Sequence, residues 1–260
     1  MKFDDINKIY FLHLSDRYDR EEWIYNQIEK MDYFDYNYNI WWTCRRLFFN
    51  NENNAFSKIG HINSNPNVIS NVINCALEHY TIIRTSYERG FNHILIFEDD
   101  VKFNINLEMF KKCIEKIPDN YCCVKFINDV WKNNKFYNKM NTITFPEITE
   151  DNIQNNDLYT KYNGNDFEKK HLCCTGAYLL DRNGMEQIIN IYHNFNGALG
   201  ADWVFKYLDY LYISNYNLIE LQNYIYSNDN LISDLMNVNT DKIFNKFIQN
   251  NNQNYIKIST

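Results

Sequence analysis

The sequence predicts an α/β fold with a mostly parallel central sheet flanked by helices. Three observations predict it. The apolar run Lys8–Leu14 precedes a helical pattern, a long amphipathic stripe precedes the apolar run His93–Phe97, and a later run, Cys173–Leu180, precedes a helix from Gly184 to His193. Strands that alternate with helices build parallel sheets, and a strand that is apolar at nearly every position is buried on both faces.

The first unit is a strand followed by a helix. Lys8–Leu14 is rich in β-forming residues, and Ser15 and Asp16 then offer side-chain oxygens that can cap a helix. Apolar residues from Trp23 to Met31 follow at helical spacing. Residues 32–65 are aromatic and rich in asparagine, with a second strand expected at Ile40–Thr43.

The next unit ends in a group of acids. Apolar residues from Ile69 to Tyr87 recur at steps of three, one and four, which predicts one helix stripe, and Gly90 ends it in a left-handed conformation. The strand His93–Phe97 follows, and directly after it come three carboxylates, Glu98–Asp100. Ligands of open α/β sheets bind at the carboxyl ends of the strands, so the acids are expected at that edge.

The remaining elements repeat the alternation of strands and helices. In chain order we expect a helix Met109–Ile117 closed by Pro118, a strand Cys122–Ile127, an irregular functional loop over residues 128–170, a helix capped by Asp181, a short amphipathic helix Ala201–Leu211 led by Asp202, and a polar tail over residues 238–260.

Composition excludes several classes of protein. The chain has 260 residues, 45% hydrophobic and 23% charged, as in globular proteins. Its net charge of −7, without a basic run, argues against a nucleic-acid partner. No apolar run is long enough for an integral membrane segment and no signal-peptide core is visible, so a cytoplasmic or membrane-peripheral location is expected. Seven cysteines without C-x-x-C spacing favour reduced thiols over a zinc site or a disulfide framework.

The acidic triplet is the strongest chemical signal. Adjacent carboxylates repel one another, and a divalent cation with a preference for oxygen ligands, Mg²⁺ or Mn²⁺, relieves that repulsion. In an extended backbone Glu98 and Asp100 point to the same side, where both can bind one metal ion, while Asp99 points away. The alternative is a solvated acidic turn.

Other candidates each have a structural alternative. Arg17 and Arg20 stand at a strand–helix junction that can bind an anion, or they pair with nearby acids on a solvated helix face. Asp202 is either a helix N-cap or a general base. His79 lies within the long helix, where a histidine is more often packed in the protein than a ligand. Cys75 has no basic group beside it in the sequence pattern, which argues against a catalytic thiol.

Together these segments resemble glycosyltransferase family 25, the lipopolysaccharide-biosynthesis and collagen β-galactosyltransferase group, over most of residues 8–235. Asn71 and Asn74 replace glycines of the family and Glu78 replaces its serine. The segments that carry the resemblance are His13–Arg20 (family N-L-x-x-R-x-x-R), Asn71–His79 (G-E-I-G-C-A-L-S-H), Ile94–Val101 (L-I-L-E-D-D-V), Thr175–Gly184, Gly200–Asp202 and Ile232–Asp234.

The resemblance implies a GT-A type, Rossmann-like domain over residues 1–237, with a nucleotide-sugar half at 1–127 and an acceptor half at 128–237. It implies transfer of galactose or glucose from a UDP-sugar to a glycan or protein acceptor, with inversion and with Mn²⁺ (or Mg²⁺). The implied roles are metal binding for Glu98 and Asp100, donor binding for Arg17, Arg20, His79 and Asp99, and general base for Asp202.

Two alternatives belong to other classes. A magnesium-dependent phosphoryl or nucleotidyl transferase also uses spaced carboxylates, although the sequence has no P-loop. A non-catalytic sugar- or nucleotide-binding relative is suggested by the changed segment between Asn71 and Glu78.

Overall fold

The computed structural model describes most of the expected elements. Arg17, Asp202 and the polar tail at 238–260 lie outside the described residues, and so does most of the expected loop at 128–170. The described residues are 1–14, 18–43, 66–127, 146–155, 157–162, 175–194, 201 and 203–221.

In the described part of the chain, seven strands form the central sheet in the order β2-β1-β3-β7-β5-β8-β6. The pairings show that five strands share one direction and that β7 and β6 run against them, which confirms the mostly parallel α/β sheet. The strands are β1 (Lys8–Leu14), β2 (Tyr38–Thr43), β3 (His93–Glu98), β5 (Cys123–Lys125), β6 (Tyr159–Tyr162), β7 (Ala177–Asp181) and β8 (Leu211–Ser214); β4 (Val101–Phe103) and β9 (Ile219–Leu221) form a separate antiparallel pair.

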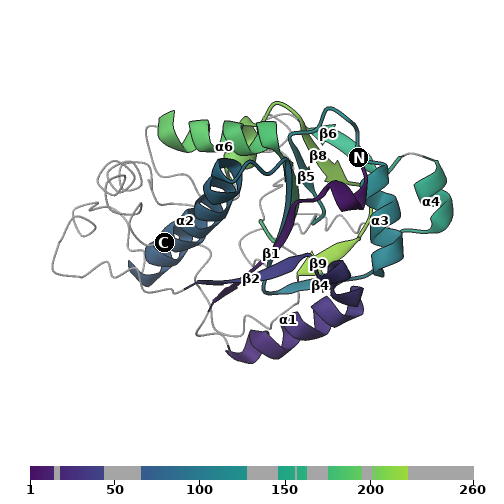
Figure 1. Ribbon diagram of the computed structural model, residues 1–260, viewed down its shortest axis with the longest axis horizontal. Coiled ribbons are helices and arrows are strands. Elements are labelled where there is room, and N and C mark those ends of the chain that lie inside the picture. Colours follow the sequence, from purple (N-terminus) through teal and green to yellow (C-terminus); the bar gives the residue numbers. More distant parts are fainter. Residues whose placement is uncertain are drawn as a thin grey trace, which may run out of the picture.

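Helices cover both faces of the sheet. Helices α2 and α6 pack together over one face, and α1 lies on the opposite side (Figure 1). The described helices are α1 (Tyr18–Lys30), α2 (Pro66–Glu88), α3 (Leu107–Glu115), α4 (Glu150–Gln154) and α6 (Arg182–Asn194), with short 3₁₀ helices η1 (Phe3–Asp5), η2 (Asp32–Tyr36) and η4 (Trp203–Tyr207).

The sheet separates two hydrophobic cores. Ile94 and Ile96 of β3 pack into a core shared with α2, α6 and η4, whereas Leu95 and Phe97 pack into a second core shared with α1 and α3. Successive side chains of a strand point to opposite faces, so the apolar run of β3 supplies both cores. We call these two sides the α2 face and the α1 face.

The end of α2 has the predicted glycine. Gly90 has a φ of +78°, the N–H of Gly90 donates to the carbonyl of Tyr87, and the N–H of Phe91 donates to the carbonyl of Ser86. This is the Schellman arrangement, which satisfies the last carbonyls of a helix. Asn71 and Asn74, which replace family glycines, lie within α2. Their backbone is therefore helical and requires no glycine.

Two sequence expectations about the later elements are wrong. The expected helix Ala201–Leu211 is instead the short 3₁₀ helix η4, and Leu211 begins strand β8. All four β8 residues are buried, and the strand pairs with β5 and β6, so tertiary pairing overrides the helical pattern.

The stretch 128–170 is also not wholly irregular, because it contains α4 and β6. Helix α4 begins with a capping box in which Thr149 and Asn152 satisfy each other's backbone N–H groups. Two expected strands are shorter in the structure: the one at Cys122–Ile127 is limited to Cys123–Lys125, and the one at Cys173–Leu180 begins at Ala177.

Candidate functional site

The three acids lie at the carboxyl edge of the sheet, as predicted. Strand β3 ends at Glu98, and Asp99 and Asp100 form a turn, so the extended backbone assumed for all three does not continue past Glu98. Strand alternation places Glu98 on the α2 face together with Ile94 and Ile96. Hydrogen bonds to Asp99 and Glu98 divide the triplet between the two faces of the sheet.

On the α1 face, Asp99 is buried between two basic side chains. It accepts a hydrogen bond from Arg20 of α1, and its Oδ2 lies 3.1 Å from Nδ1 of His13, at the end of β1. The guanidinium of Arg20 also lies 3.5 Å from Asp100. Arg20 is 8% exposed, so it belongs to this buried cluster and not to a solvated helix face.

Asp100 is a buried carboxylate at the turn after β3. It is 6% exposed, and among the residues that the structure describes its Oδ1 has no hydrogen-bond partner. Burial and the negative charge of Glu98 raise the pKa of Asp100 to about 7, against the opposing effect of Arg20. A cation bound at Oδ1 would satisfy this oxygen and favour the ionised form.

On the α2 face, Glu98 is held by two side chains. His79 Nε2 lies 3.1 Å from Glu98 Oε1, and the hydroxyl of Thr175 donates to the same oxygen. Burial acts to raise the pKa of Glu98, but the hydrogen bonds from His79 and Thr175 and the charge of His79 outweigh it, so its pKa is lowered. His79 is buried, and its Nδ1 lies 2.7 Å from the Tyr178 hydroxyl.

Cys75 lies one helical turn before His79. One ligand atom each from Cys75, His79 and Glu98 lies within 4.8 Å of the other two. The expectation that no basic group stands beside Cys75 is therefore wrong. Side chains four positions apart share one face of a helix, and that spacing was the available sequence signal.

Several residues at this edge were not predicted from the sequence. Lys125 of β5 is 1% exposed, pairs in register with Tyr178 of β7, and its Nζ lies 5.3 Å from the centre of the Phe205 ring. A lysine inside an otherwise apolar strand was the signal for it, because lysine is rarely fully buried. His13 stands at the first position of the segment that resembles the family's N-L-x-x-R-x-x-R.

An exposed aromatic ring borders the α1-face cluster. Trp42, near the carboxyl end of β2, is 50% exposed, and its ring lies edge-on to His13 with centroids 4.8 Å apart. The preceding Trp41 donates its indole N–H to Glu78 on α2 at 3.1 Å. Burial raises the pKa of Glu78, which the hydrogen bond from Trp41 partly offsets. The residue that replaces the family serine thus links β2 to α2.

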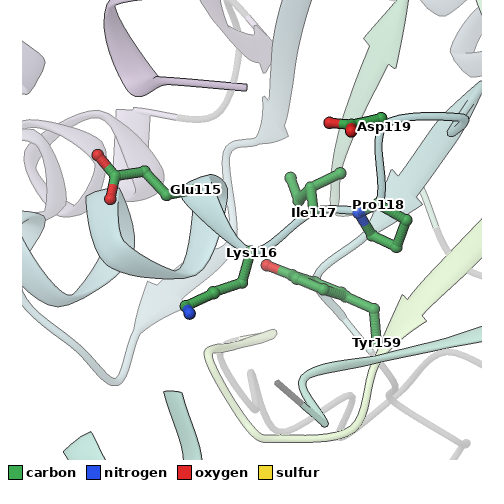
Figure 2. Close-up of a pocket in the computed structure, with 6 residues that line it drawn as sticks. All are labelled: Glu115, Lys116, Ile117, Pro118, Asp119 and Tyr159. Carbon is green, nitrogen blue, oxygen red and sulfur yellow. The ribbon is translucent and has the colours of Figure 1, made fainter. Parts of the chain in front are cut away.

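A separate surface hollow contains none of the predicted site residues. It has a volume of about 350 Å³ and lies between the end of α3 and the start of β6 (Figure 2). Tyr159 reaches across it and donates its hydroxyl to the carbonyl of Cys113. The lining residues are Glu115, Lys116, Ile117, Pro118, Asp119 and Tyr159.

Comparison with protein families decides the general chemistry. The family model described as "Glycosyltransferase family 25 (LPS biosynthesis protein)" matches residues 6–208, more than half of the chain. The chain belongs to glycosyltransferase family 25. Every predicted site residue lies within the match, from Arg17 to Asp202. The membership identifies the protein as a glycosyltransferase, with a sugar donor and an acceptor, and favours sugar transfer over phosphoryl transfer.

Two further findings concern similar proteins and membrane-spanning helices. No curated protein matched the sequence significantly. In the described portion of this family 25 glycosyltransferase, no helix has the length and apolar character needed to span a bilayer.

Proposed function

We propose that this family 25 enzyme transfers a hexose, galactose or glucose, from a UDP-sugar to a hydroxyl of a glycan or protein acceptor. We further propose that the reaction depends on a metal ion and inverts the anomeric carbon. The observation that carries the proposal is the buried Oδ1 of Asp100, which has no hydrogen-bond partner among the described residues. It lies beside Glu98 and Asp99, at the edge of the sheet where ligands bind.

The residues present fit a divalent cation with a preference for oxygen ligands. Asp100 and Glu98 would hold Mn²⁺ (or Mg²⁺), because carboxylate oxygens are the ligands these ions prefer. When bound, the ion would neutralise charge that develops on the diphosphate leaving group. The raised pKa of Asp100 supports this assignment, since it reflects negative charge held close together in a buried place.

The chain's own residues would position the donor. Arg20 brings a guanidinium to the acidic turn. Arg17, three positions before it in the sequence, would supply a second cation to the donor. The half-exposed ring of Trp42 offers a surface on which the uracil base can stack. The buried ammonium of Lys125 would add positive charge on the α2 face.

The acceptor needs a base on the side opposite the leaving group. We assign this role to Asp202, which would take the proton of the acceptor hydroxyl while that oxygen bonds to the anomeric carbon and the bond to the diphosphate breaks. The flanking residues Ala201 and Val204 are buried in the core of the α2 face. We place donor binding in residues 1–127, acceptor binding in 128–237 and an accessory tail at 238–260.

The acidic triplet can be tested by calorimetry. We expect UDP to bind the wild-type enzyme only with Mn²⁺, and Asp100→Asn to weaken this binding by about 100-fold, because a direct ligand should matter at least as much as groups that support ligands. The exposed Asp119→Asn, in the hollow of Figure 2, is the matched control and should bind like wild type.

Each outcome has a defined meaning. Metal-dependent UDP binding that survives in Asp100→Asn would remove Asp100 from the ligand set, and wild-type UDP binding that ignores metal would overturn the metal-dependent reaction. The family description refers to lipopolysaccharide biosynthesis, so lipopolysaccharide glycans are the first acceptors to assay with UDP-galactose and UDP-glucose.

A further inference from the structure

A second group of potential metal ligands lies on the α2 face and includes Glu98 of the acidic triplet. Cys75 and His79 project from one side of α2, and Glu98 meets them from the end of β3. Their ligand atoms lie within 4.8 Å of one another. Around a tetrahedral zinc ion, bond lengths of about 2.0–2.3 Å put ligand atoms roughly 3.3–3.8 Å apart, so small side-chain rotations would bring the three into coordination distance.

The surroundings of His79 suit a metal ligand. Histidines that bind a metal usually donate their other ring N–H to an oxygen, and the Tyr178 hydroxyl lies 2.7 Å from His79 Nδ1. The hydrogen bond between His79 Nε2 and Glu98 Oε1, at 3.1 Å, places one proton between these two atoms. A divalent cation bound by both atoms would take the place of that proton.

The Glu98 carboxylate is held in place by a hydrogen bond, and solvent can reach the three candidate ligands. The hydroxyl of Thr175 donates to Glu98 Oε1, which fixes the carboxylate, as supporting groups do in metal sites. The Glu98 side chain is 25% exposed and Cys75 is exposed, while His79 is buried. An ion can therefore enter from the side of Cys75, and a water molecule can complete its coordination there.

We propose that Cys75, His79 and Glu98 bind a zinc-class divalent cation, with a fourth position left for water or a substrate oxygen. A thiolate and an imidazole favour Zn²⁺ over Mn²⁺ or Mg²⁺, so this site differs in its other ligands from the oxygen-ligand site assigned to Asp100, with which it shares Glu98. The bound ion would tie α2 to the carboxyl edge of β3. The proposal does not depend on the identity of the sugar donor.

Because the cysteines show no C-x-x-C spacing, the sequence pattern gives little support to a zinc site. This group uses a different arrangement, with two ligands four positions apart on a helix and a third contributed by a strand end 19 residues further on. Only the packing of α2 against the sheet brings Glu98 to the pair.

Cobalt spectroscopy tests the proposal directly. Apo enzyme prepared by chelation is titrated with Co²⁺, and we expect a thiolate-to-cobalt charge-transfer band and the visible absorption of tetrahedral cobalt. Cobalt bound at the oxygen-ligand site of Asp100 gives no thiolate band. Zn²⁺ should abolish both signals by displacement. Cys75→Ser should remove the charge-transfer band, and His79→Gln should weaken Zn²⁺ binding by about 100-fold.

Two variants distinguish an effect on metal binding from a general effect on the structure. Tyr178→Phe, which removes only the hydroxyl beside His79, should weaken Zn²⁺ binding by about 10- to 100-fold. Cys122→Ser is the matched control, since this thiol accepts hydrogen bonds from Asn183 and Gln187 that a serine can also accept, and its cobalt spectrum should equal that of wild type.

The wild-type protein supplies a readout that needs no variant. Bound Zn²⁺ should protect Cys75 from alkylation by iodoacetamide, measured by mass spectrometry of the intact, folded enzyme. A cobalt spectrum without a thiolate band, a band that persists in Cys75→Ser, or alkylation of Cys75 at the same rate with and without Zn²⁺ would each overturn the proposal. Asp100→Asn should keep the cobalt spectrum while it loses Mn²⁺-dependent UDP binding, so the two proposals fail separately.

Discussion

Asp181 shows how one residue links packing to pH. Its Oδ1 accepts the N–H of Gly184 at 2.6 Å and so caps the start of α6, as the sequence predicts. Burial raises its pKa to about 6, and hydrogen bonds from the backbone of Gly184 and Asn183 only partly offset this. The folded protein therefore holds a proton on Asp181 more tightly than the unfolded chain does.

This difference predicts the pH dependence of stability. Between the ordinary aspartate pKa of 3.8 and about 6, the folded state binds more protons, so the stabilisation from Asp181 is complete at low pH and is lost as pH rises through 6. Asp181→Asn should remove that dependence. Because Asp181 is partly exposed, we expect a change on the order of 1 kcal/mol after allowance for solvent screening.

Urea unfolding from about pH 4 to about pH 7 measures the effect. The free energy of unfolding of Asp181→Asn, relative to wild type, should rise across this range, with the exposed Asp119→Asn as control. A difference that stays constant with pH would show that Asp181 ionises equally in both states.

At the scale of elements, the junction of β7 and α6 requires close contact between the backbone of Gly184 and the backbone of Cys122. A Cβ added at Gly184 would lie 2.0 Å from the carbonyl oxygen of Cys122, which belongs to the backbone just before β5. Gly90, at the end of α2, has a positive φ but no atom within 4 Å of an added Cβ. The two glycines are therefore needed for different reasons, one for space and the other for backbone conformation.

Alanine substitutions distinguish these reasons. Gly184→Ala should lower the free energy of unfolding by about 3 kcal/mol, since the carbonyl of Cys122 cannot move without disturbing the sheet. Gly90→Ala should cost only about 1 kcal/mol, the usual penalty for a left-handed alanine. Chemical denaturation of both variants gives the comparison, and equal losses would contradict the packing argument.

At the scale of the whole molecule, the residues that the structure describes pack into two cores, one on each side of the seven-stranded sheet. Phe97 and Phe103 pack edge-to-face in the α1-face core with ring centroids 5.0 Å apart, whereas Ile188 of α6 lies in the α2-face core. Residues that share a contact couple energetically, while residues separated by the sheet contribute independently.

Double-mutant cycles should therefore divide the molecule along the sheet. The pair Phe97→Leu and Phe103→Leu should show a coupling energy of about 0.5–3 kcal/mol, and the pair Phe97→Leu and Ile188→Val should be additive to within about 0.5 kcal/mol. Global unfolding in urea provides each free energy. Strong coupling between Phe97 and Ile188 would show that the two cores behave as one.

The features that could be predicted without the structure are those that depend on local patterns of residues. Strand β1, the Gly90 stop, the Asp181 cap and the place of the acids after an apolar strand follow from periodicity and turn chemistry, which depend on neighbouring residues. The family resemblance also rested on such short segments, and the match over residues 6–208 confirms it.

How these residues contact one another depends on the packing of segments that are far apart in the chain. Asp99 contacts Arg20 and Glu98 contacts His79, because the chain turns after Glu98 and because α1 and α2 pack on opposite faces of the sheet. Pairing between strands far apart in the chain likewise made a strand of Leu211–Ser214. These outcomes depend on contacts between distant segments, whose free energy no local pattern of residues contains.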